Sequence, residues 1–334
     1  MALGALNRGW EVLGIRHGYE GVLVDEPDAV INLDRDAVRG IGHLGGTILG
    51  TTNRNDPFNY PVERDGRKVS TDVADRVVER LRTLGIEALV ALGGDGSMSL
   101  AKRLMDRGMC RVIGVPKTID NDLRGTNVTF GFATAVETTT EALDRLHSTA
   151  QAHRRVMVVE VMGRHAGWIA LHAGLSGGAN VILIPEIEFD LDRVCDYIVR
   201  RFDSHYSPIV VVAEGAQPKG GIPSADGAPT DAFGHARLGG IANWLEGEIE
   251  QRTGHEARAT VLGHVQRGGT PTAFDRVLAT RFGLHAIDAA HEGRWGKMTA
   301  LRSTDIQLVD LSEATAELKT VPESLYREAE VFFG

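Results

Sequence analysis

The chain alternates between short runs of apolar residues and longer stretches in which apolar residues recur every three or four positions. Short runs bounded by turn residues are typical of buried strands, and the wider spacing is typical of amphipathic helices. The runs predict strands at residues 9–15, 86–92, 111–115, 155–161, 181–185, 209–213 and 259–263. The stretches predict helices at residues 73–84, 98–106, 133–146, 191–202, 235–253 and 273–291. This alternation favours an α/β fold with mostly parallel sheets.

The predicted strands from residue 86 onwards end in polar residues. Open parallel sheets bind their ligands at the carboxyl ends of the strands, so the functional site is expected there. The length of 334 residues indicates two domains, since one domain takes about 150 residues. A long loop rich in Gly and Pro is expected at residues 218–234, where a lid and a simple insertion both fit the composition.

Composition excludes several classes of protein. With 36 Lys and Arg against 45 Asp and Glu, the net charge of −9 argues against general binding of nucleic acid or acidic membranes. The 2 cysteines, Cys110 and Cys195, cannot form a disulfide scaffold or a cysteine metal site, which favours a reducing cytoplasm. No run approaches the roughly 18 apolar residues of a membrane span, and the first residues lack the apolar core of a signal peptide.

Several common nucleotide and metal motifs do not occur. Gly296-Lys297 is followed by Met298 rather than Ser or Thr and lacks the upstream Gly of a phosphate-binding lysine loop. Neither a His-Glu-x-x-His motif nor a Gly-x-Gly-x-x-Gly motif after a strand is present. These absences argue against P-loop kinases, zinc proteases and ordinary dinucleotide enzymes.

A first cluster, Gly93-Gly94-Asp95-Gly96-Ser97, stands at a predicted strand-to-helix turn. Residues without side chains let backbone amides and a helix N-terminus approach a phosphate, and an Asp in such a loop suits Mg²⁺. A tight turn without any ligand would use the same glycines.

A second cluster at residues 116–122 contains Lys117, Thr118, Asp120 and Asp122 after the next strand. A carboxylate beside a hydroxyl substrate can accept its proton while a phosphoryl group moves. A turn built on Asn or Asp side chains would explain one of the acids, but it explains the preceding Lys and Thr less well.

The third and fourth clusters, residues 162–168 and 258–269, carry arginines flanked by glycine after buried strands. A guanidinium binds phosphate with two parallel hydrogen bonds. A single arginine of this kind is more often a surface ion pair, but four clusters at strand ends are harder to explain in that way.

The four clusters, in this order and at this spacing, resemble those of the phosphofructokinase family over about residues 9–310. The resemblance implies two facing α/β/α lobes with mostly parallel sheets. The lobe that binds the phosphoryl donor would comprise residues 1–131 plus 266–306, and the lobe that binds fructose 6-phosphate would comprise residues 132–265 plus 307–334. It also implies a homodimer or homotetramer with shared active sites. The cysteine content, the charge and the lack of an apolar span add the expectation of a cytoplasmic protein with neither nucleic acid nor membrane as a partner.

The activity implied by the resemblance is that of a Mg²⁺-dependent 6-phosphofructokinase of glycolysis. Such an enzyme transfers the γ-phosphate of ATP to the 1-hydroxyl of fructose 6-phosphate, giving fructose 1,6-bisphosphate. In this family's pattern Asp120 would be the base, Thr118 and Arg164 would contact the transferred group, Asp122 would support the base near the metal, and Asp95 would hold Mg²⁺.

The resemblance also implies two sets of binding residues. The donor would lie along Gly96, Ser97 and Met98, with Arg54 less well aligned to the family's pattern. The sugar phosphate would be held by Thr118, Asp120, Asp122, Arg155, Met162, Gly163, Arg164, Glu214, Arg258, His264 and Arg267. Of these, Arg155 and Arg258 would reach in from a neighbouring subunit.

Two positions bear on the choice of donor. Gly96 leaves open the space that a second Asp occupies in relatives that use pyrophosphate, which favours ATP. Lys117 stands where allosteric ATP-dependent bacterial enzymes have Gly and pyrophosphate users have Lys. The combination resembles a mixed subgroup that includes ATP users, and a pyrophosphate-dependent enzyme is the alternative.

The chain also departs from the family's pattern. His147 and Asn180 replace the Arg and Glu of the usual bacterial effector site, so that site is expected to be altered. The first strand and Gly-rich loop of the family have no counterpart here, which gives a second alternative, an N-terminally truncated member without catalysis. A diacylglycerol or NAD kinase would share only the first cluster, and the other three clusters argue against it.

Overall fold

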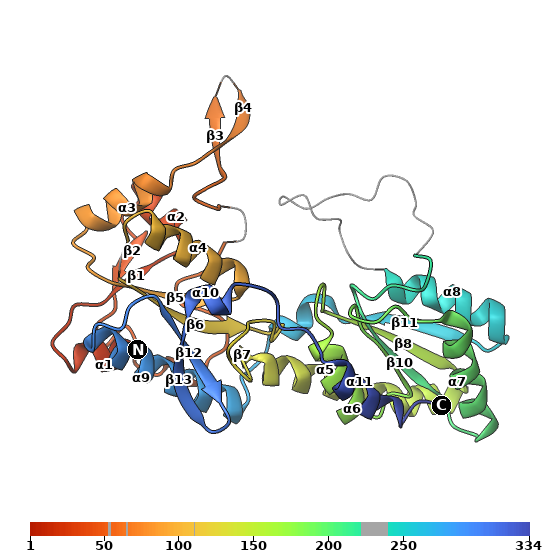
Figure 1. The fold of residues 1–334 in the computed structure, drawn as a ribbon. Coiled ribbons are helices and arrows are strands. Elements are labelled where there is room, and N and C mark those ends of the chain that lie inside the picture. Colours follow the sequence, from red (N-terminus) through yellow and green to blue (C-terminus); the bar gives the residue numbers. More distant parts are fainter. Residues whose placement is uncertain (53–54, 65, 110, 222–239) are drawn as a thin grey trace. The chain divides into compact units, whose positions relative to one another are not determined.

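The computed structural model describes residues 1–52, 55–64, 66–109, 111–221 and 240–334. The chain divides into two compact units (Figure 1). Unit 1 comprises Met1–Lys117, Leu123–Phe130 and Ala273–Glu317. Unit 2 comprises Thr118–Asp122, Gly131–Thr272 and Leu318–Gly334. Both have an α/β architecture.

Unit 1 is built on a sheet with the strand order β13-β12-β6-β5. The strands β5, β6 and β12 are parallel, and β13 is antiparallel to β12. These strands are β5 (Leu89–Gly93), β6 (Val112–Thr118), β12 (Lys297–Arg302) and β13 (Asp305–Asp310). The helices are α1 (Ala2–Leu6), α2 (Glu20–Leu23), α3 (Ala74–Thr83), α4 (Asp95–Asp106), α9 (Ala273–His291) and α10 (Leu311–Ala314).

Alternate residues of β6 enter two different hydrophobic clusters of unit 1. Val112 belongs to the cluster formed with α3, α4 and α10, whereas Ile113 and Val115 belong to the cluster formed with α9. Successive side chains of a strand point to opposite faces, so both faces of this sheet are covered. Two small antiparallel strand pairs complete the unit together with the 3₁₀ turn Ile41–His43. The first pair is β1 (Leu13–Ile15) with β2 (Val30–Asn32), and the second is the hairpin of β3 (Tyr60–Arg64) and β4 (Arg67–Thr71).

Unit 2 contains a four-stranded, fully parallel sheet with the order β11-β8-β10-β9. Its strands are β8 (Val156–Val161), β9 (Val181–Leu183), β10 (Ile209–Ala213) and β11 (Ala257–Val261). Helices α7 (Leu191–Asp203) and α8 (Ile241–Thr253) share a buried cluster with one face of this sheet. Helices α5 (Phe132–His153) and α6 (Trp168–Ser176) contact its strands as well, and the C-terminal helix α11 (Glu323–Glu330) contacts α6.

One charged residue is buried inside the sheet of unit 2. Glu160 in β8 is 3% exposed, and its carboxylate accepts hydrogen bonds from the backbone of Gly240 and Ala242 at 3.0–3.2 Å. These amides stand at the start of α8, whose first N–H groups have no partner within the helix. Glu160 therefore closes the N-terminus of α8 from a neighbouring strand.

Most predicted elements are present with shifted ends. The spacing predicts a helix over residues 98–106, but α4 begins at Asp95, and the helix predicted at 133–146 continues to His153. The strand predicted at 259–263 is β11, which begins and ends two residues earlier. The hairpins at residues 60–71 and 297–310 were not predicted, because their strands lack the continuous apolar runs by which the other strands are identified.

The unit boundaries also differ from the expected lobe boundaries. Residues 305–310 form β13, which pairs along its whole length with β12, so the segment 307–317 lies in unit 1 rather than with residues 132–265. Residues 118–122 and 266–272 lie in unit 2 instead of unit 1. Most of the predicted long loop, from residue 222, lies outside the described residues.

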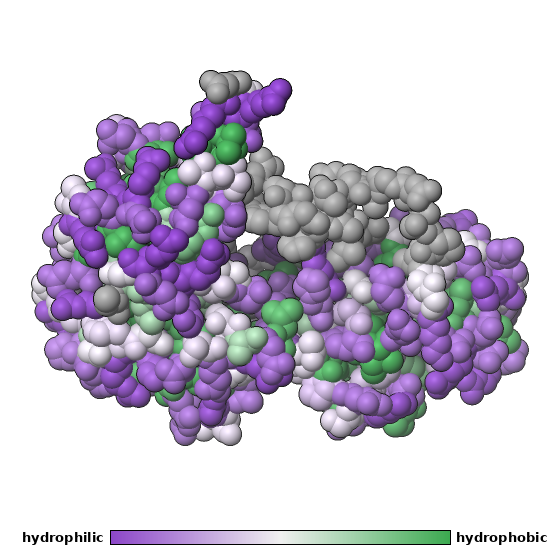
Figure 2. All heavy atoms as spheres, turned by 45° about the horizontal axis from the view of Figure 1, so that its top comes forward, coloured by the Kyte–Doolittle hydropathy of each residue, from purple (hydrophilic) through white to green (hydrophobic). Residues whose placement is uncertain are grey.

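On the face shown in Figure 2, hydrophilic residues dominate and apolar residues occur in small groups. Among the helices of the described residues, none combines the length and apolar character needed to cross a membrane.

Candidate active site

Three neighbouring strands of unit 2 end in predicted site residues. Met162, Gly163 and Arg164 follow β8, Glu214 follows β10, and His264 and Arg267 lie on the 3₁₀ turn Gly263–Arg267 after β11. Because β11, β8 and β10 are adjacent and parallel, their carboxyl ends lie along one edge of the sheet. The structure therefore brings these residues to one edge, as the strand-end argument predicts.

Glu214 is half-buried at this edge, and its surroundings change its acidity. Burial raises the pKa of its carboxyl above the ordinary value of 4.5. A hydrogen bond from the backbone of Gly163 and the charge of Arg164 lower this pKa, whereas the carboxylates of Glu160 and Asp120 raise it further. Glu214 is thus a carboxylate with both an amide donor and a guanidinium in its surroundings.

Gly163 is at this position because a side chain does not fit. Its φ is +146°, and a Cβ placed there would lie 2.8 Å from the carbonyl oxygen of Ala166. A larger residue would shift the loop that carries Arg164 and the hydrogen bond to Glu214.

Gln266 holds the turn after β11 against the end of β8. Its side chain is 1% exposed, and its Oε1 accepts a hydrogen bond from the backbone N–H of Met162 at 3.2 Å. In the same region, Nε of Arg267 lies 3.3 Å from Sδ of Met162. Gln266 is a positioning residue that was not predicted, because an amide between valine and arginine gives no signal in the sequence.

The predicted base lies in a loop that belongs to unit 2, residues 118–122. The backbone N–H of Asp120 donates to the Thr118 hydroxyl at 3.1 Å, and this hydroxyl lies 3.3 Å from Oδ2 of Asp120. Thr118 is 8% exposed and Asp120 is half-buried. The Asp120 carboxylate is therefore partly accessible, and the threonine beside it is buried. The next residue, Asn121, is buried and has a left-handed backbone with φ of +53°.

In unit 1, the first cluster forms the turn between β5 and the first turn of α4. Asp95 and Gly96 are exposed there, and a Cβ at Gly96 would meet no atom within 4 Å. At Gly93, by contrast, there is no room for a side chain, since an added Cβ would lie 2.2 Å from the Ser97 hydroxyl. Lys117, at the end of β6, is also exposed.

Met98, one of the residues along which the resemblance places the donor, is a core residue of unit 1. Its side chain is 0% exposed, and its N–H donates to the carbonyl of Gly94 at 3.0 Å within the helix. Arg54, the donor residue that is less well aligned to the family's pattern, lies outside the described residues.

The Asp95 carboxylate fits a Mg²⁺ ion. Mg²⁺ keeps several waters and is usually bound by one or two carboxylates together with substrate phosphates, so a single exposed acid at a helix start is sufficient from the protein. No group of three or more His, Cys, Asp or Glu that could hold a metal occurs within the described ranges.

Arg155 and Arg258 lie at the other end of the sheet. Arg155 precedes β8, Arg258 is the second residue of β11, and both pair with Glu256, Arg155 at 3.4 Å. A strand of six residues is about 20 Å long, so this chain does not bring them to Met162 and Arg164.

The two positions expected to alter the effector site have roles within unit 2. Nε2 of His147 lies 2.7 Å from the carbonyl oxygen of Gly177. Asn180 is 6% exposed, and its Oδ1 accepts a hydrogen bond from the backbone N–H of Ile209 at 3.0 Å. Asn180 therefore joins the loop before β9 to the start of β10.

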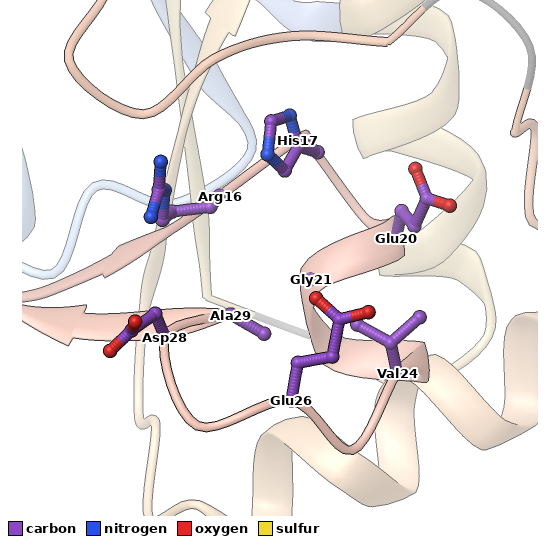
Figure 3. A pocket seen from close by; sticks show the side chains of 8 residues that line it. All are labelled: Arg16, His17, Glu20, Gly21, Val24, Glu26, Asp28 and Ala29. Carbon is purple, nitrogen blue, oxygen red and sulfur yellow. The ribbon is translucent and has the colours of Figure 1, made fainter.

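A cavity of about 360 Å³ in unit 1 contains none of the predicted site residues (Figure 3). Gly21 lines it with no room for a side chain, since a Cβ would lie 2.3 Å from the carbonyl oxygen of Arg16. Figure 3 shows Glu26 extending into the space from the loop after α2. The cavity is lined by Arg16, His17, Glu20, Gly21, Val24, Glu26, Asp28 and Ala29.

Comparison with known proteins shows the family of the chain. Residues 1–290 match the model of the family described as phosphofructokinase, and the chain belongs to this family. It is 56% identical over 331 residues to a pyrophosphate–fructose 6-phosphate 1-phosphotransferase of Streptomyces coelicolor, covering 99% of this chain and 93% of that protein. It is 51% identical over 326 residues to ATP-dependent 6-phosphofructokinase 3 of the same organism, covering 97% and 91%.

Solved structures give the same fold. The crystal structure of a pyrophosphate-dependent phosphofructokinase from Marinobacter aquaeolei is similar with a TM-score of 0.77 and 26% identity, over 97% of this chain and 81% of that chain. The expected phosphofructokinase-like α/β fold is therefore confirmed.

Proposed function

We propose that the protein is a Mg²⁺-dependent 6-phosphofructokinase that transfers a phosphoryl group to the 1-hydroxyl of fructose 6-phosphate and gives fructose 1,6-bisphosphate. The observation that carries this proposal is the single edge of the unit 2 sheet at which residues 162–164, Glu214 and the turn with His264 and Arg267 meet. Glycines, arginines and a half-buried carboxylate at one edge suit an anionic sugar with several hydroxyls.

The chemistry would be carried by the 118–122 loop. The Asp120 carboxylate accepts the proton of the 1-hydroxyl while the new O–P bond forms and the bond to the leaving phosphate breaks. The Thr118 hydroxyl beside Asp120 and the Arg164 guanidinium would stabilise the charge on the transferred group. Mg²⁺, held by Asp95, would neutralise charge on the donor phosphates.

Binding of the sugar phosphate would use the remaining groups at the sheet edge. Arg267 and His264 are exposed on their turn and suit the 6-phosphate. Glu214, with its raised pKa, suits a sugar hydroxyl, because a half-buried carboxylate is a strong acceptor of hydrogen bonds.

A homo-oligomer with shared active sites is supported by Arg155 and Arg258. Both are at the amino end of their strands, away from the residues that would hold the sugar in the same chain. They would therefore serve the site of a second copy of the chain.

ATP is the donor that the surroundings of Gly96 favour, since the open space there accepts a nucleotide phosphate that a second carboxylate would repel. Pyrophosphate is the second candidate. It is supported by the exposed Lys117 and by the 56% identity to a pyrophosphate–fructose 6-phosphate 1-phosphotransferase.

The test is a coupled assay with fructose 6-phosphate and Mg²⁺, run in parallel with ATP and with pyrophosphate. Turnover with ATP at a kcat/KM at least about tenfold above that with pyrophosphate supports the first candidate, and the reverse ratio supports the second. The absence of turnover with both donors contradicts the proposed function and supports a member of the family without catalysis.

A further inference from the structure

Lys319 reaches the loop of the proposed base from a distant part of the sequence. It belongs to residues 318–334, which return to unit 2 after the last segment of unit 1. Its Nζ donates a hydrogen bond to Oδ1 of Asn121 at 2.8 Å, and its backbone N–H donates to the carbonyl of Asp122 at 2.7 Å. Both the side chain and the backbone of Lys319 therefore hold the two residues that follow Asp120.

The same lysine contacts the start of α6, directly after the loop that carries Arg164. Its carbonyl oxygen accepts a hydrogen bond from Nε1 of Trp168 at 2.8 Å, and its Nζ lies 5.3 Å from the centre of the Trp168 ring. At this distance the ammonium and the ring attract each other.

Glu186 forms a second link between the loop before α6 and the segment around Lys319. Its carboxylate accepts hydrogen bonds from the backbone of Gly167, at 3.0 and 3.1 Å, and of Val321, at 2.8 Å. The loop before α6 and the segment around Lys319 are thus joined on both sides of Trp168.

We propose that Lys319 is a positioning residue that fixes the loop of Asp120 relative to the loop of Arg164. The proposal rests on the proposed function, because the roles of Asp120 and Arg164 define what is positioned. Asn121 has a left-handed backbone with φ of +53°, a conformation that Asn adopts more readily than other non-glycine residues. The hydrogen bonds from Lys319 to Asn121 and Asp122 hold this turn directly beside the base.

The surroundings of Lys319 suit a fixed position rather than a mobile surface cation. Burial lowers its pKa to about 8, although the nearby charge of Asp122 acts in the opposite direction. Burial and the charge of Lys319 together lower the pKa of His172 in α6, whose ring centre lies 6.0 Å from that of Trp168. A lysine that is largely removed from solvent and hydrogen-bonded to two segments can keep one segment in a fixed position relative to the other.

The test compares Lys319→Met and Lys319→Arg with the wild-type chain. Methionine keeps the length of the side chain without its charge, and arginine keeps the charge. Since a displacement of about 1 Å at a reacting group costs about 100-fold in rate, we expect Lys319→Met to lower kcat by about 10- to 100-fold. The KM for fructose 6-phosphate should change less than about threefold, and Lys319→Arg should recover part of kcat.

A matched control is Lys219→Met, which removes an exposed lysine of unit 2 that pairs with Asp190. It should leave kcat and KM as in the wild type. A lysine with only a structural role would lower the melting temperature and the fraction of folded enzyme, but would leave kcat per folded site unchanged. Such a result for Lys319→Met contradicts the proposal.

Hydrogen exchange gives a second readout that needs no turnover. In Lys319→Met, or in Lys319→Gln if the first variant does not fold, amides of residues 119–123 and 164–168 should exchange at least about tenfold faster, with β8 unchanged. Unchanged exchange at 119–123 overturns the proposal. If the wild type has no activity with either donor, the proposed function fails, and the exchange rates still decide whether Lys319 holds this loop.

Discussion

At the scale of single residues, three carboxylates of unit 2 have three different surroundings. Glu160 is fully buried and bonded to two backbone amides, so it serves the fold. Asp120 is half-buried and shares a hydrogen bond with the threonine two residues before it. Glu214 is also half-buried, and burial raises its pKa. The surroundings of each carboxylate therefore suit a different role: structure for Glu160 and, in the proposed function, proton transfer for Asp120 and binding for Glu214.

Asp120→Ala should remove most turnover while leaving sugar-phosphate affinity largely unchanged. A base acts on the transition state more than on the bound ground state, so kcat should fall by about 100- to 10,000-fold. Steady-state kinetics and calorimetric titration with fructose 6-phosphate separate the two effects. A raised KM with normal kcat would show that Asp120 binds substrate instead of accepting a proton.

Glu214→Gln should stabilise the protein at neutral pH although it weakens sugar binding. The folded-state pKa of Glu214 lies above 4.5, so between pH 4.5 and that pKa the folded chain keeps a proton that the unfolded chain has lost. Stability from this group is therefore lost as pH rises through that window, and above it the folded state contains a partly buried charge. Glutamine removes this cost.

Thermal melts of Glu214→Gln and wild type at pH 5 and pH 7.5 measure this effect. We expect Tm to rise by about 2 °C at pH 7.5 and the difference to shrink towards pH 5. An equal shift at both pH values would exclude the ionised carboxylate as its cause.

At the scale of elements, helix α4 presents its N-terminus to the proposed donor. The first turn carries Asp95 and the exposed Gly96, where backbone N–H groups and the helix dipole favour anions. A carboxylate added there competes with a bound phosphate for the same positive end. The effect of a substitution at Gly96 on donor binding therefore depends on the helix dipole as much as on the size of the new side chain.

Gly96→Asp should lower kcat/KM for ATP by at least about tenfold more than for pyrophosphate. The fold should tolerate the change, since a Cβ at Gly96 meets no atom within 4 Å. Ser99→Asp adds the same charge at an exposed position of α4 and serves as control. Equal losses of kcat/KM with both donors would refute the argument that the open space at Gly96 favours ATP.

At the scale of the whole molecule, the chain passes repeatedly between two units with separate cores. Residues 118–122 and 318–334 belong to unit 2, although the segments next to them in sequence belong to unit 1. The proposed base is thus in the unit that would bind the sugar, and the proposed metal ligand Asp95 is in the other. Each ligand should therefore stabilise a different set of segments.

Hydrogen exchange with single ligands tests this division. Fructose 6-phosphate alone should slow exchange at residues 161–167, 213–216 and 262–268, whereas Mg²⁺ with the donor alone should slow exchange at residues 93–101. Helix α7, which carries no predicted site residue, is the control segment. Protection of 93–101 by the sugar phosphate alone would contradict the assignment of the two ligands to separate units.

Local sequence patterns were sufficient for much of this protein. Buried runs such as 155–161 and 209–213 predict strands because a parallel sheet covered on both faces needs continuous apolar residues. Polar clusters after those strands predict the site because parallel strands bring their carboxyl ends to one edge. Both conclusions depend on residues that are close in sequence, and the fold confirms the strands.

Other features depend on packing between distant segments and were decided only by the tertiary structure. The side chain of Met98, a residue predicted beside the donor, is in the core because it lies on the same buried face of α4 as Ala101 and Leu104. Gln266 and Lys319 hold site loops 104 and 198 residues away from themselves in sequence, at Met162 and Asn121. A local pattern contains no information on such partners, so the sequence determines which residues can do the chemistry, and the tertiary contacts determine which residues hold them in place.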